Sequence, residues 1–499
     1  MLTVSRSFPS SSPPRASTLT ILCGAWLSLT ACGGGPAPEG QDGESGESET
    51  GESDAGESET GDTGLIDPEP NDEAAFLYDQ DQFRTYELII DEADLAFLDA
   101  DPAAEQYVPG VLRFEGQDYG VGVRYKGSLG AWVGCTEAAS DEDPFAVGGA
   151  KTCPKLGMKV SFNWADPEGR FFGVKKLLFH AMNLDPSMMR ERLGYWLYRQ
   201  MGVAAPRAVH ARLLINGELA GVFLNLEYID GRFTRSRFAD GEGNLYKEVW
   251  PTAGSLQAPA TEAALLDALR TNKDEDPSVQ KLLDFGTAVM SQDGANGADR
   301  AEVIGQWMDV DTTMRTIAVD RTIRADDGMF HFYCSNGGCG NHNFYFYEEV
   351  ETDRVWVIPW DLDNAFVVHN PMYEGTGLDR FVQVVDEWNA LDLPCVPHPG
   401  SSQSSLLQMP PACDPLMRGW AQFDAEYEAG VGALLDGPFS AEVVEALVDD
   451  WDGQIRATVE AAYDADPEQL PPATFDVALA DFSERCDLLR VRAAQTIGG

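Results

Sequence analysis

The sequence predicts an α+β protein with an antiparallel-sheet part followed by a mainly helical part. From Tyr86 to Leu226, short segments alternate polar and apolar residues, which is the period of half-buried strands. Farther along, Gln280–Ser291 and Asp311–Arg324 are expected to be helices. An acidic segment rich in Gly and Ser precedes both parts. We therefore expect a signal at 1–31, a tether at 32–75, a first lobe at 76–230 and a second lobe at 231–499.

The first 31 residues have the features of a secretory signal. Arg6 and Arg15 precede an apolar run, and Leu-Thr-Ala stands directly before Cys32. This order indicates a lipobox, so Cys32 is expected to become the lipid-bearing N-terminus and anchor the protein to a membrane. An ordinary signal peptide with an incidental cysteine is the alternative. The expected location is the bacterial cell envelope, at the outer membrane or the cell surface.

The segment from Pro36 to Ala75 has 14 acidic residues, no Lys or Arg and no aromatic residue. Such a composition cannot bury enough apolar surface to offset chain entropy, so a disordered spacer is expected. The whole chain carries a net charge of −47. This acidity excludes nucleic acid as a partner, because phosphate binding needs a basic surface. It favours basic protein substrates, with plain solubility as the other explanation.

Cysteine usage is typical of an exported protein. Clustering along the chain suggests three disulfides, and the seventh cysteine after Cys32 is then an odd, buried thiol. The expected pairs are Cys135 with Cys153, Cys334 with Cys339 and Cys395 with Cys413, and the odd residue is Cys486. Zinc is disfavoured, because only Cys334 and Cys339 have a short spacing.

Strands of the first lobe direct basic side chains to one side. Arg124 and Lys126 alternate with apolar residues in the segment 120–126, and Lys159 does the same in 156–162. From these strands a lysine could reach the phosphates of a nucleotide, although a solvated face is the commoner reason for such a residue. Lys159 and Lys126 both remain candidates, and Arg124 could assist either.

A helix and a hinge are expected next. Asp185 and Pro186 are predicted to begin a helix that Gly202 ends, with Glu191 off its apolar stripe. A hairpin around Asn216-Gly217 then leads to Glu227 at a hinge between the lobes.

The second lobe carries an ordered set of acidic and amide residues. Asp327, Asn343, Asp361 and Asp363 lie around a predicted hairpin of the strands 344–347 and 355–359. Oxygen ligands of this kind hold divalent cations and orient a hydroxyl. A Lys, a Glu, a hinge, an Asp, an Asn and an Asp in this order are what a protein-kinase-like fold requires.

Several motifs resemble the CotH family, the atypical kinases similar to spore coat protein H. They are RYKGS at 124–128, NLYK at 244–247, GNHNFYFY at 340–347 and IPWDLDNAF at 358–366. The resemblance implies an atypical two-lobed kinase-like fold that transfers a phosphoryl group from ATP, with Mg²⁺ or Mn²⁺, to Ser or Thr of secreted or surface proteins. No HRD, DFG or P-loop sequence occurs, so the nucleotide pocket is expected to be atypical and the nucleotide is left open.

Roles follow from the resemblance and the order of residues. Lys159 with Glu191 and Asp327 form the expected catalytic set, with Asp326 as the rival of Asp327. Lys126, Arg124 and Glu227 are expected to bind the nucleotide. The expected metal ligands are Asp361, Asn343 and Asp363, and a structural calcium site is the alternative.

Two other functions compete with the kinase. One is a surface lipoprotein that binds or adheres without catalysis, but a scaffold needs no Asp327, Asn343 and Asp361 together. The other is a metal-dependent phosphoesterase, which lacks the His and Asp cluster of a two-metal site.

Overall fold

The computed structural model describes residues 72–497, except 128, 141–145, 254–258, 274–276, 293–297, 326–327, 336–337, 367–387, 389–405 and 409–412. The expected signal peptide, Cys32 and the tether up to residue 71 lie outside the described residues. The chain divides into two units, Met1–Gly33 and Gly34–Gly499, and every described residue belongs to the second.

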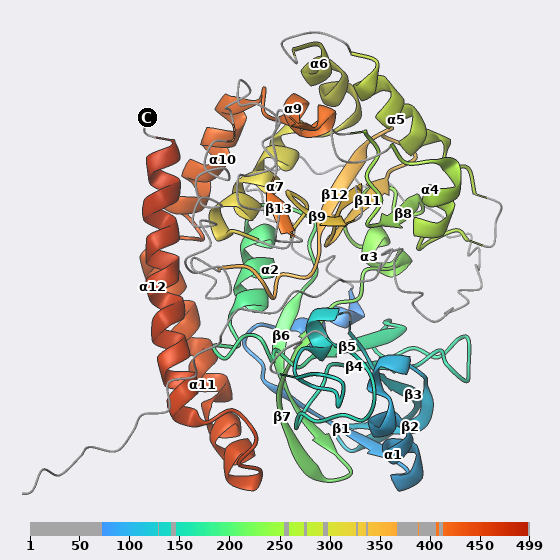
Figure 1. Cartoon of the computed structure of the whole chain (residues 1–499), viewed down its shortest axis with the longest axis vertical. Coiled ribbons are helices and arrows are strands. Elements are labelled where there is room, and N and C mark those ends of the chain that lie inside the picture. The colour runs from blue at the N-terminus through green and yellow to red at the C-terminus, as the bar shows by residue number, and fades with distance from the viewer. Residues whose placement is uncertain are drawn as a thin grey trace, which may run out of the picture. The chain divides into compact units, whose positions relative to one another are not determined.

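Seven strands of the first part form a closed barrel in the order β1-β2-β3-β4-β5-β7-β6 (Figure 1). All neighbouring strands are antiparallel except β1 and β6, whose parallel pairing closes the barrel. The antiparallel sheet was predicted, whereas this closure was not. The strands are β1 (Arg84–Ile90), β2 (Val108–Phe114), β3 (Gln117–Tyr125), β4 (Met158–Ser161), β5 (Lys176–His180), β6 (Ala208–Ile215) and β7 (Glu218–Leu226).

Alternation along the strands separates an apolar barrel interior from a polar outer face, as predicted. Val123 and Tyr125 of β3 and Val160 of β4 belong to the buried cluster inside the barrel. Residues at the intervening positions therefore point outward, and the register sets Arg124 of β3 opposite Lys159 of β4. A short helix, α1 (Glu92–Ala100), begins at Asp91 as expected, and the 3-10 helices are η1 (Glu73–Tyr78), η2 (Pro102–Ala104) and η3 (Leu129–Trp132).

Helix α2 (Arg190–Gln200) begins five residues later than predicted. The backbone of Met188 is left-handed, with φ of 60°, which prevents a helix from running through it. Asp185 nevertheless accepts a hydrogen bond from the backbone N of Arg190 at 2.9 Å, so it fixes the start of the helix from outside. The helix ends at Gly202 as predicted, where φ is 71°.

Helices dominate the second part and enclose a small sheet in the order β12-β11-β8. Two further apolar clusters fill this part, one around α2, α11 and α12 and one around α4 to α10. The α+β class with an N-terminal sheet region and a helical C-terminal region is thus confirmed. The strands are β8 (Asn244–Lys247), β9 (His331–Ser335), β10 (Gly338–Asn341), β11 (Phe344–Glu348), β12 (Val355–Pro359) and β13 (Leu406–Gln408). The helices are α3 (Gly231–Arg235), α4 (Glu262–Ala268), α5 (Gln280–Met290), α6 (Ala298–Trp307), α7 (Val310–Ile323), α9 (Pro415–Trp420), α10 (Asp424–Asp436), α11 (Ala441–Ala465) and α12 (Pro472–Thr496).

The cysteines agree with the predicted pattern where the structure describes them. Cys135 is joined to Cys153 and closes the irregular insertion between β3 and β4. Cys486 is a free, buried thiol. Cys413 is disulfide-bonded, but Cys395 lies outside the described residues. Cys334 and Cys339 are register partners in β9 and β10, and their side chains also lie outside the described set, so both pairings stay predictions.

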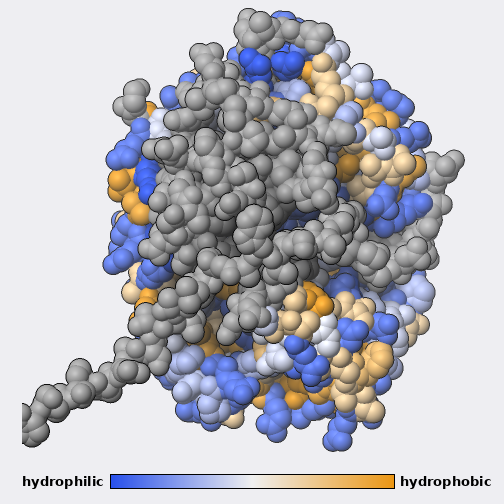
Figure 2. Space-filling view, viewed as in Figure 1, coloured by the Kyte–Doolittle hydropathy of each residue, from blue (hydrophilic) through white to orange (hydrophobic). Residues whose placement is uncertain are grey.

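Where Figure 2 shows residues in colour, hydrophilic and hydrophobic residues are interspersed. In the described part of the chain, no helix combines the length and apolar character needed to cross a bilayer.

Candidate functional site

The centre of the candidate site is a pair formed by β5 and α2. Strand β5 ends at His180. The side chains of Lys176, Leu178 and His180 lie on the same, outward side of this strand. The Nδ1 atom of His180 lies 3.0 Å from both carboxylate oxygens of Glu191, in the first turn of α2. Glu191 is 4% exposed, so this contact is almost closed to water.

Lys126 extends this pair into a chain of three side chains. It follows β3 directly, and its Nζ atom lies 3.1 Å from Nε2 of His180. An ammonium group only donates, so Nε2 accepts and Nδ1 carries the proton that is donated to Glu191. The imidazole therefore connects the positive charge of Lys126 to the negative charge of Glu191.

Asp361 adds a second, half-buried carboxylate beside this chain. Asp361 follows β12, and its backbone is left-handed with φ of 53°. Its backbone N donates a hydrogen bond to the hydroxyl oxygen of Tyr195 on α2 at 2.9 Å. Burial raises the pKa of the Asp361 carboxyl and the charge of Glu191 adds to this, whereas the charges of Lys126, His180 and Lys247 act in the opposite direction. A strained backbone and a carboxyl with an altered pKa are both typical of functional sites.

Trp360 joins the two halves of this cluster. Its ring lies edge-on to His180, with 6.3 Å between ring centroids, and Nζ of Lys126 is 5.6 Å from the ring centroid. Its backbone N donates to the backbone O of Asn343 at 3.1 Å. The segment that carries Asp361 is thus tied both to the barrel and to the end of the acidic hairpin.

Asn343 and Asp363 flank Asp361, as the sequence suggested. Asn343 is also left-handed, with φ of 63°, and its backbone N donates to Oε1 of Glu248 at 3.3 Å. The backbone O of Asp363 accepts from Nη1 of Arg190, at the start of α2. Among the described residues, no group of three or more His, Cys, Asp or Glu is arranged to hold a metal ion. Oxygen atoms of Asp361, Asp363 and Asn343 nevertheless have the chemistry that Mg²⁺ prefers, and a cation would offset the crowding of Asp361 and Glu191.

Lys159 and Arg124 lie on the same outer face of the barrel and have contacts other than the one that joins Lys126 to His180. Nζ of Lys159 is 4.9 Å from the ring centroid of Tyr228, and Lys176 lies at the same distance from that ring. Arg124 pairs with Glu105 at 2.7 Å and is 2% exposed. The residue that the structure brings to Glu191 through His180 is therefore Lys126, the alternative that the sequence had left open.

Glu227 is enclosed by three arginines at the end of β7. The contacts are 2.5 Å to Arg207, 3.2 Å to Arg232 and 2.9 Å to Arg237. Burial acts to raise the pKa of Glu227, but the charges of Arg207 and Arg237 outweigh it and hold the pKa far below its usual value. Its carboxylate is thus already fully engaged, at the hinge position where a nucleotide contact had been predicted.

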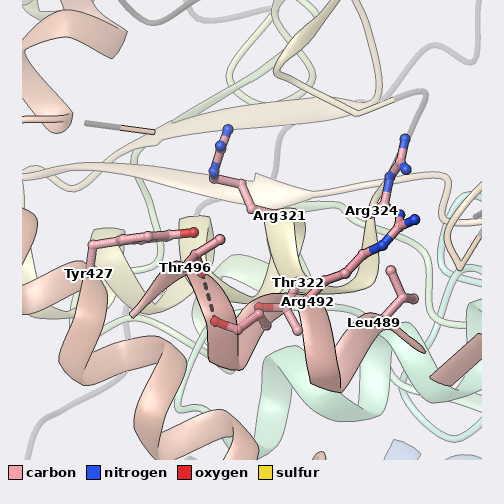
Figure 3. A pocket seen from close by; sticks show the side chains of 8 residues that line it. Arg321, Thr322, Arg324, Tyr427, Leu489, Arg492 and Thr496 are labelled. Atoms are coloured by element: carbon pink, nitrogen blue, oxygen red, sulfur yellow. Dashed lines mark hydrogen bonds between the residues drawn. The ribbon is translucent and has the colours of Figure 1, made fainter. Parts of the chain in front are cut away.

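Asp327 and its rival Asp326 lie outside the described residues. They follow α7, whose C-terminal end borders a pocket lined by Arg321, Thr322, Arg324, Tyr427, Leu489, Arg492, Ala493 and Thr496 (Figure 3). Among the residues that the structure describes, none of the predicted site residues lines this pocket.

Sequence reasoning missed His180, Tyr195 and Trp360. Strand β5 is mostly apolar, so no alternating pattern marks His180 at its end. Tyr195 lies one helical turn after Glu191, on the same side of α2.

The fold and the cluster define a class of protein before any comparison. It is an α+β protein whose strand barrel and first long helix present a Lys–His–Glu chain to a half-buried aspartate. The model of the CotH kinase protein family matches residues 123–484, from β3 into α12, and the chain belongs to this family.

Individual relatives are distant. Inner spore coat protein H of Bacillus subtilis is 24% identical over 291 residues, which cover 57% of this chain and 69% of that protein. Invasin CotH7 of Rhizopus delemar is 24% identical over 218 residues, 42% of this chain and 34% of the relative. Spore coat protein homolog 1 of the same organism is 25% identical over 219 residues, and the match spans 35% of its length. The match thus spans about one third of the two Rhizopus proteins.

Proposed function

We propose that this protein is an exported, lipid-anchored atypical kinase that transfers a phosphoryl group from ATP to Ser or Thr of secreted or surface proteins. Membership of the CotH kinase family supports phosphotransfer and the use of ATP. The observation that carries the proposal is the contact chain from Lys126 through His180 to Glu191, beside the half-buried Asp361. A scaffold would have no need for such a costly arrangement of charges.

Each residue has a role in the proposed reaction. Lys126 binds the phosphates of ATP, and His180 and Glu191 hold its ammonium group in place. Asp361 with Asn343 and Asp363 would hold Mg²⁺ or Mn²⁺, which neutralises charge on the phosphates during transfer. Asp327 orients the hydroxyl of the acceptor. The two-lobed kinase-like arrangement, with the barrel as one lobe and Glu227–Asp230 as the hinge, is part of this proposal.

The protein acceptor is proposed to be basic. The chain has 82 acidic and 35 basic residues, so an acidic acceptor would be repelled at low salt. The lipid on Cys32 and the acidic tether would hold the kinase at the cell envelope and give it reach toward neighbouring surface proteins.

The test is transfer of labelled phosphate from ATP, with magnesium or manganese, by the purified ectodomain. Autophosphorylation and a basic Ser- and Thr-containing peptide are the two acceptors. Wild type is expected to label both, and Glu191→Gln to label them at a rate that is lower by roughly 10² and still measurable. If wild type labels neither acceptor, the non-catalytic surface lipoprotein becomes the better explanation.

A further inference from the structure

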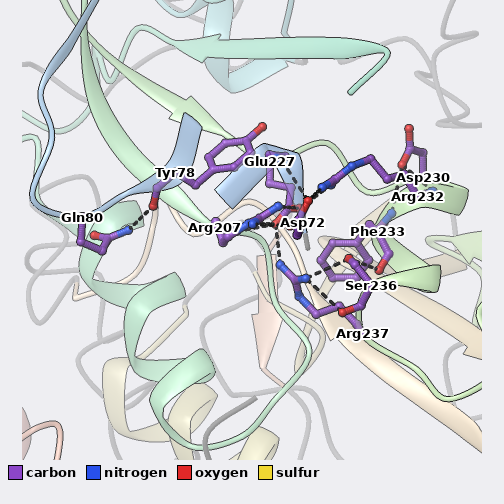
Figure 4. Close-up of polar contacts among 11 residues, drawn as sticks. Asp72, Tyr78, Gln80, Arg207, Glu227, Asp230, Arg232, Phe233, Ser236 and Arg237 are labelled. Carbon is purple, nitrogen blue, oxygen red and sulfur yellow. Dashed lines mark hydrogen bonds and ion pairs between the residues drawn. The ribbon is translucent and has the colours of Figure 1, made fainter. Parts of the chain in front are cut away.

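The segment Asp72–Phe83, which we call the strap, runs from the hinge to helix α2. It consists of η1 and the turn that leads into β1. At its start, Asp72 forms ion pairs with Arg207 and Arg232 (Figure 4). The ring of Tyr78 lies beneath Arg207, with 4.7 Å between the guanidinium carbon and the ring centroid. The strap lies outside the part of the chain that the family model matches.

At its end, the strap contacts the residue next to Glu191. The Nη2 atom of Arg192 donates to the backbone O of Gln80 at 2.9 Å, and Nε of Arg192 donates to Oε1 of Gln80 at 3.3 Å. The amide of Gln80 also donates to the backbone O of Ala208 on β6 at 3.0 Å. Gln80 thus joins α2 to the edge of the barrel.

Two further elements complete the surroundings of Arg192. Its Nη1 atom donates to Nδ1 of His210 on β6 at 2.8 Å and to Oε1 of Gln454 on α11 at 3.0 Å. The guanidinium also lies 4.2 Å from the ring centroid of Trp451. Gln454 in turn donates to the backbone O of Gln80 at 3.1 Å, so α11 and the strap support each other.

The chemistry of this arrangement is unusual for a buried arginine. Arg192 is 0% exposed, and it donates to neutral acceptors on Gln80, His210 and Gln454. His210 must be neutral to accept at Nδ1, and its Nε2 then donates to the backbone O of Met188 at 2.8 Å, just before α2 begins. Burial lowers the pKa of His210 well below its usual value, which keeps it neutral. A buried cation that is held by hydrogen bonds to neutral groups needs each of these groups in place, because a lost hydrogen bond is not replaced by water.

Glu191 and Arg192 are consecutive residues of one helix, about 100° apart around its axis. Glu191 faces His180 and Lys126, while Arg192 faces the strap, β6 and α11. Any rotation or shift of α2 that breaks the Arg192 contacts also moves the carboxylate of Glu191.

We propose that the strap is a positioning element of the site, in which Gln80 and Gln454 fix Arg192 and thereby hold α2 with Glu191 against His180 and Lys126. The catalytic consequence rests on the proposed kinase function, whereas the fixing of α2 does not. In the sequence, the strap continues directly from the acidic segment.

Hydrogen exchange of the α2 backbone amides tests the structural half in the full ectodomain. Gln80→Ala removes the side-chain hydrogen bonds with Arg192, Ala208 and Tyr78 and keeps the backbone O. We expect α2 amides to exchange about tenfold faster or more, as for the loss of a hydrogen bond to a charged group. Gln82→Ala is the matched control, because Gln82 is exposed and lies two residues away on the same strap. Equal α2 exchange in Gln80→Ala, Gln82→Ala and wild type would overturn the proposal.

A double-mutant cycle of transfer rates tests the catalytic half. Gln80→Ala is expected to lower kcat about tenfold with little change in the KM for ATP, and to have no further effect in a Glu191→Gln background. Equal losses from Gln80→Ala in both backgrounds would show that the strap does not act through Glu191 and would refute the positioning role. If wild type transfers no phosphate at all, the kinase function fails, and the exchange experiment still decides whether the strap fixes α2.

Discussion

Lys126 is distinguished from the other lysines of the barrel's outer face by its contact with His180, 3.1 Å away. Lys159 and Lys176 instead lie against Tyr228. We therefore expect Lys126→Met to lower kcat/KM for phosphate transfer by roughly 10² to 10³, the usual loss for a preorganised charged group. Lys159→Met is the matched control and should act mainly on the KM for ATP. A larger loss of kcat in Lys159→Met would reverse this assignment.

Asp361 should show opposite effects on stability and on activity. Desolvation and the charge of Glu191 both raise the pKa of the Asp361 carboxyl, so Asp361→Asn should stabilise the metal-free protein. Transfer should fall by roughly 10² or more, because an amide cannot balance the charge of a metal ion. Thermal unfolding and transfer assays check the two halves.

The control for this prediction is Asp353→Asn, since Asp353 has an 83% exposed side chain. Asp353→Asn should leave the unfolding midpoint and the rate of phosphate transfer unchanged. A lower unfolding midpoint or unchanged transfer in Asp361→Asn would contradict the role given to Asp361.

From the sequence, a site residue could be predicted only where its own type and position indicate a function. Glu191, Asp361 and Asn343 stood out because acidic or amide groups follow recognisable elements. His180 did not, since its role depends on Lys126, 54 residues earlier, and on Glu191 in the next element. The choice between Lys126 and Lys159 was equally beyond the sequence, because both occupy outward positions and the contact of Lys126 with His180 joins residues that are 54 apart.

At the scale of elements, the hinge is held by the ion pairs of Glu227 with three arginines. Glu227→Gln leaves this buried positive charge uncompensated, so the free energy of unfolding should fall by about 3 to 5 kcal/mol. Asp118→Asn is the control, since the pair of Asp118 with Arg113 lies in solvent. Denaturant unfolding at pH 7 measures both variants, and a similar small change in the two would contradict the structural role of the network.

The same network gives a pH dependence with a defined sign. The pKa values of Glu227 and Asp72 are both lowered by arginines although burial opposes this, so the unfolded chain binds protons at a higher pH than the folded protein does. Their contribution to stability is present above about pH 4.5, the range of unperturbed carboxyls, and is lost as the pH falls below it. Between pH 5 and pH 3, the free energy of unfolding should fall less steeply in Glu227→Gln than in wild type. If the two proteins lose stability in parallel over this range, the prediction is wrong.

Helices and strands were predicted well where a local sequence rule determines them. They were predicted poorly where pairing between distant strands determines the structure. The alternation in β3 and β4 identified the inner and outer faces correctly, because it follows from strand geometry alone. Closure of the barrel depends on β1 pairing with β6, more than 120 residues later, and no local pattern encodes that. Helix α2 was predicted to begin at Asp185, but the left-handed Met188 delays it, and an unusual φ at a non-glycine residue has no sequence signature.

For the whole molecule, the order of parts follows from composition. The acidic segment lacks the apolar and aromatic residues that a core needs, and the described structure begins at Asp72, where the chain first enters the buried hinge network. The expected tether boundary at residue 75 lies inside the strap. Composition does not mark this boundary, because Asp72 has the same chemistry as the acidic residues before it and differs only in its contacts with Arg207 and Arg232.

Attachment of the whole molecule to a membrane depends on Cys32 in our interpretation. The Leu-Thr-Ala-Cys sequence ends an apolar run, and in the described residues no helix offers another way to cross a bilayer. Cys32→Ser should therefore move the protein from the membrane fraction to the soluble fraction and abolish incorporation of labelled fatty acid. The variant should keep its transfer activity, because the tether separates residue 32 from the strap by about 40 residues and an acidic, Gly- and Ser-rich spacer transmits little strain. Cys486→Ala, which changes the free thiol in the folded part, is the control and should remain in the membrane fraction. An unchanged distribution of Cys32→Ser would refute the lipid anchor and leave the proposed phosphotransfer untouched.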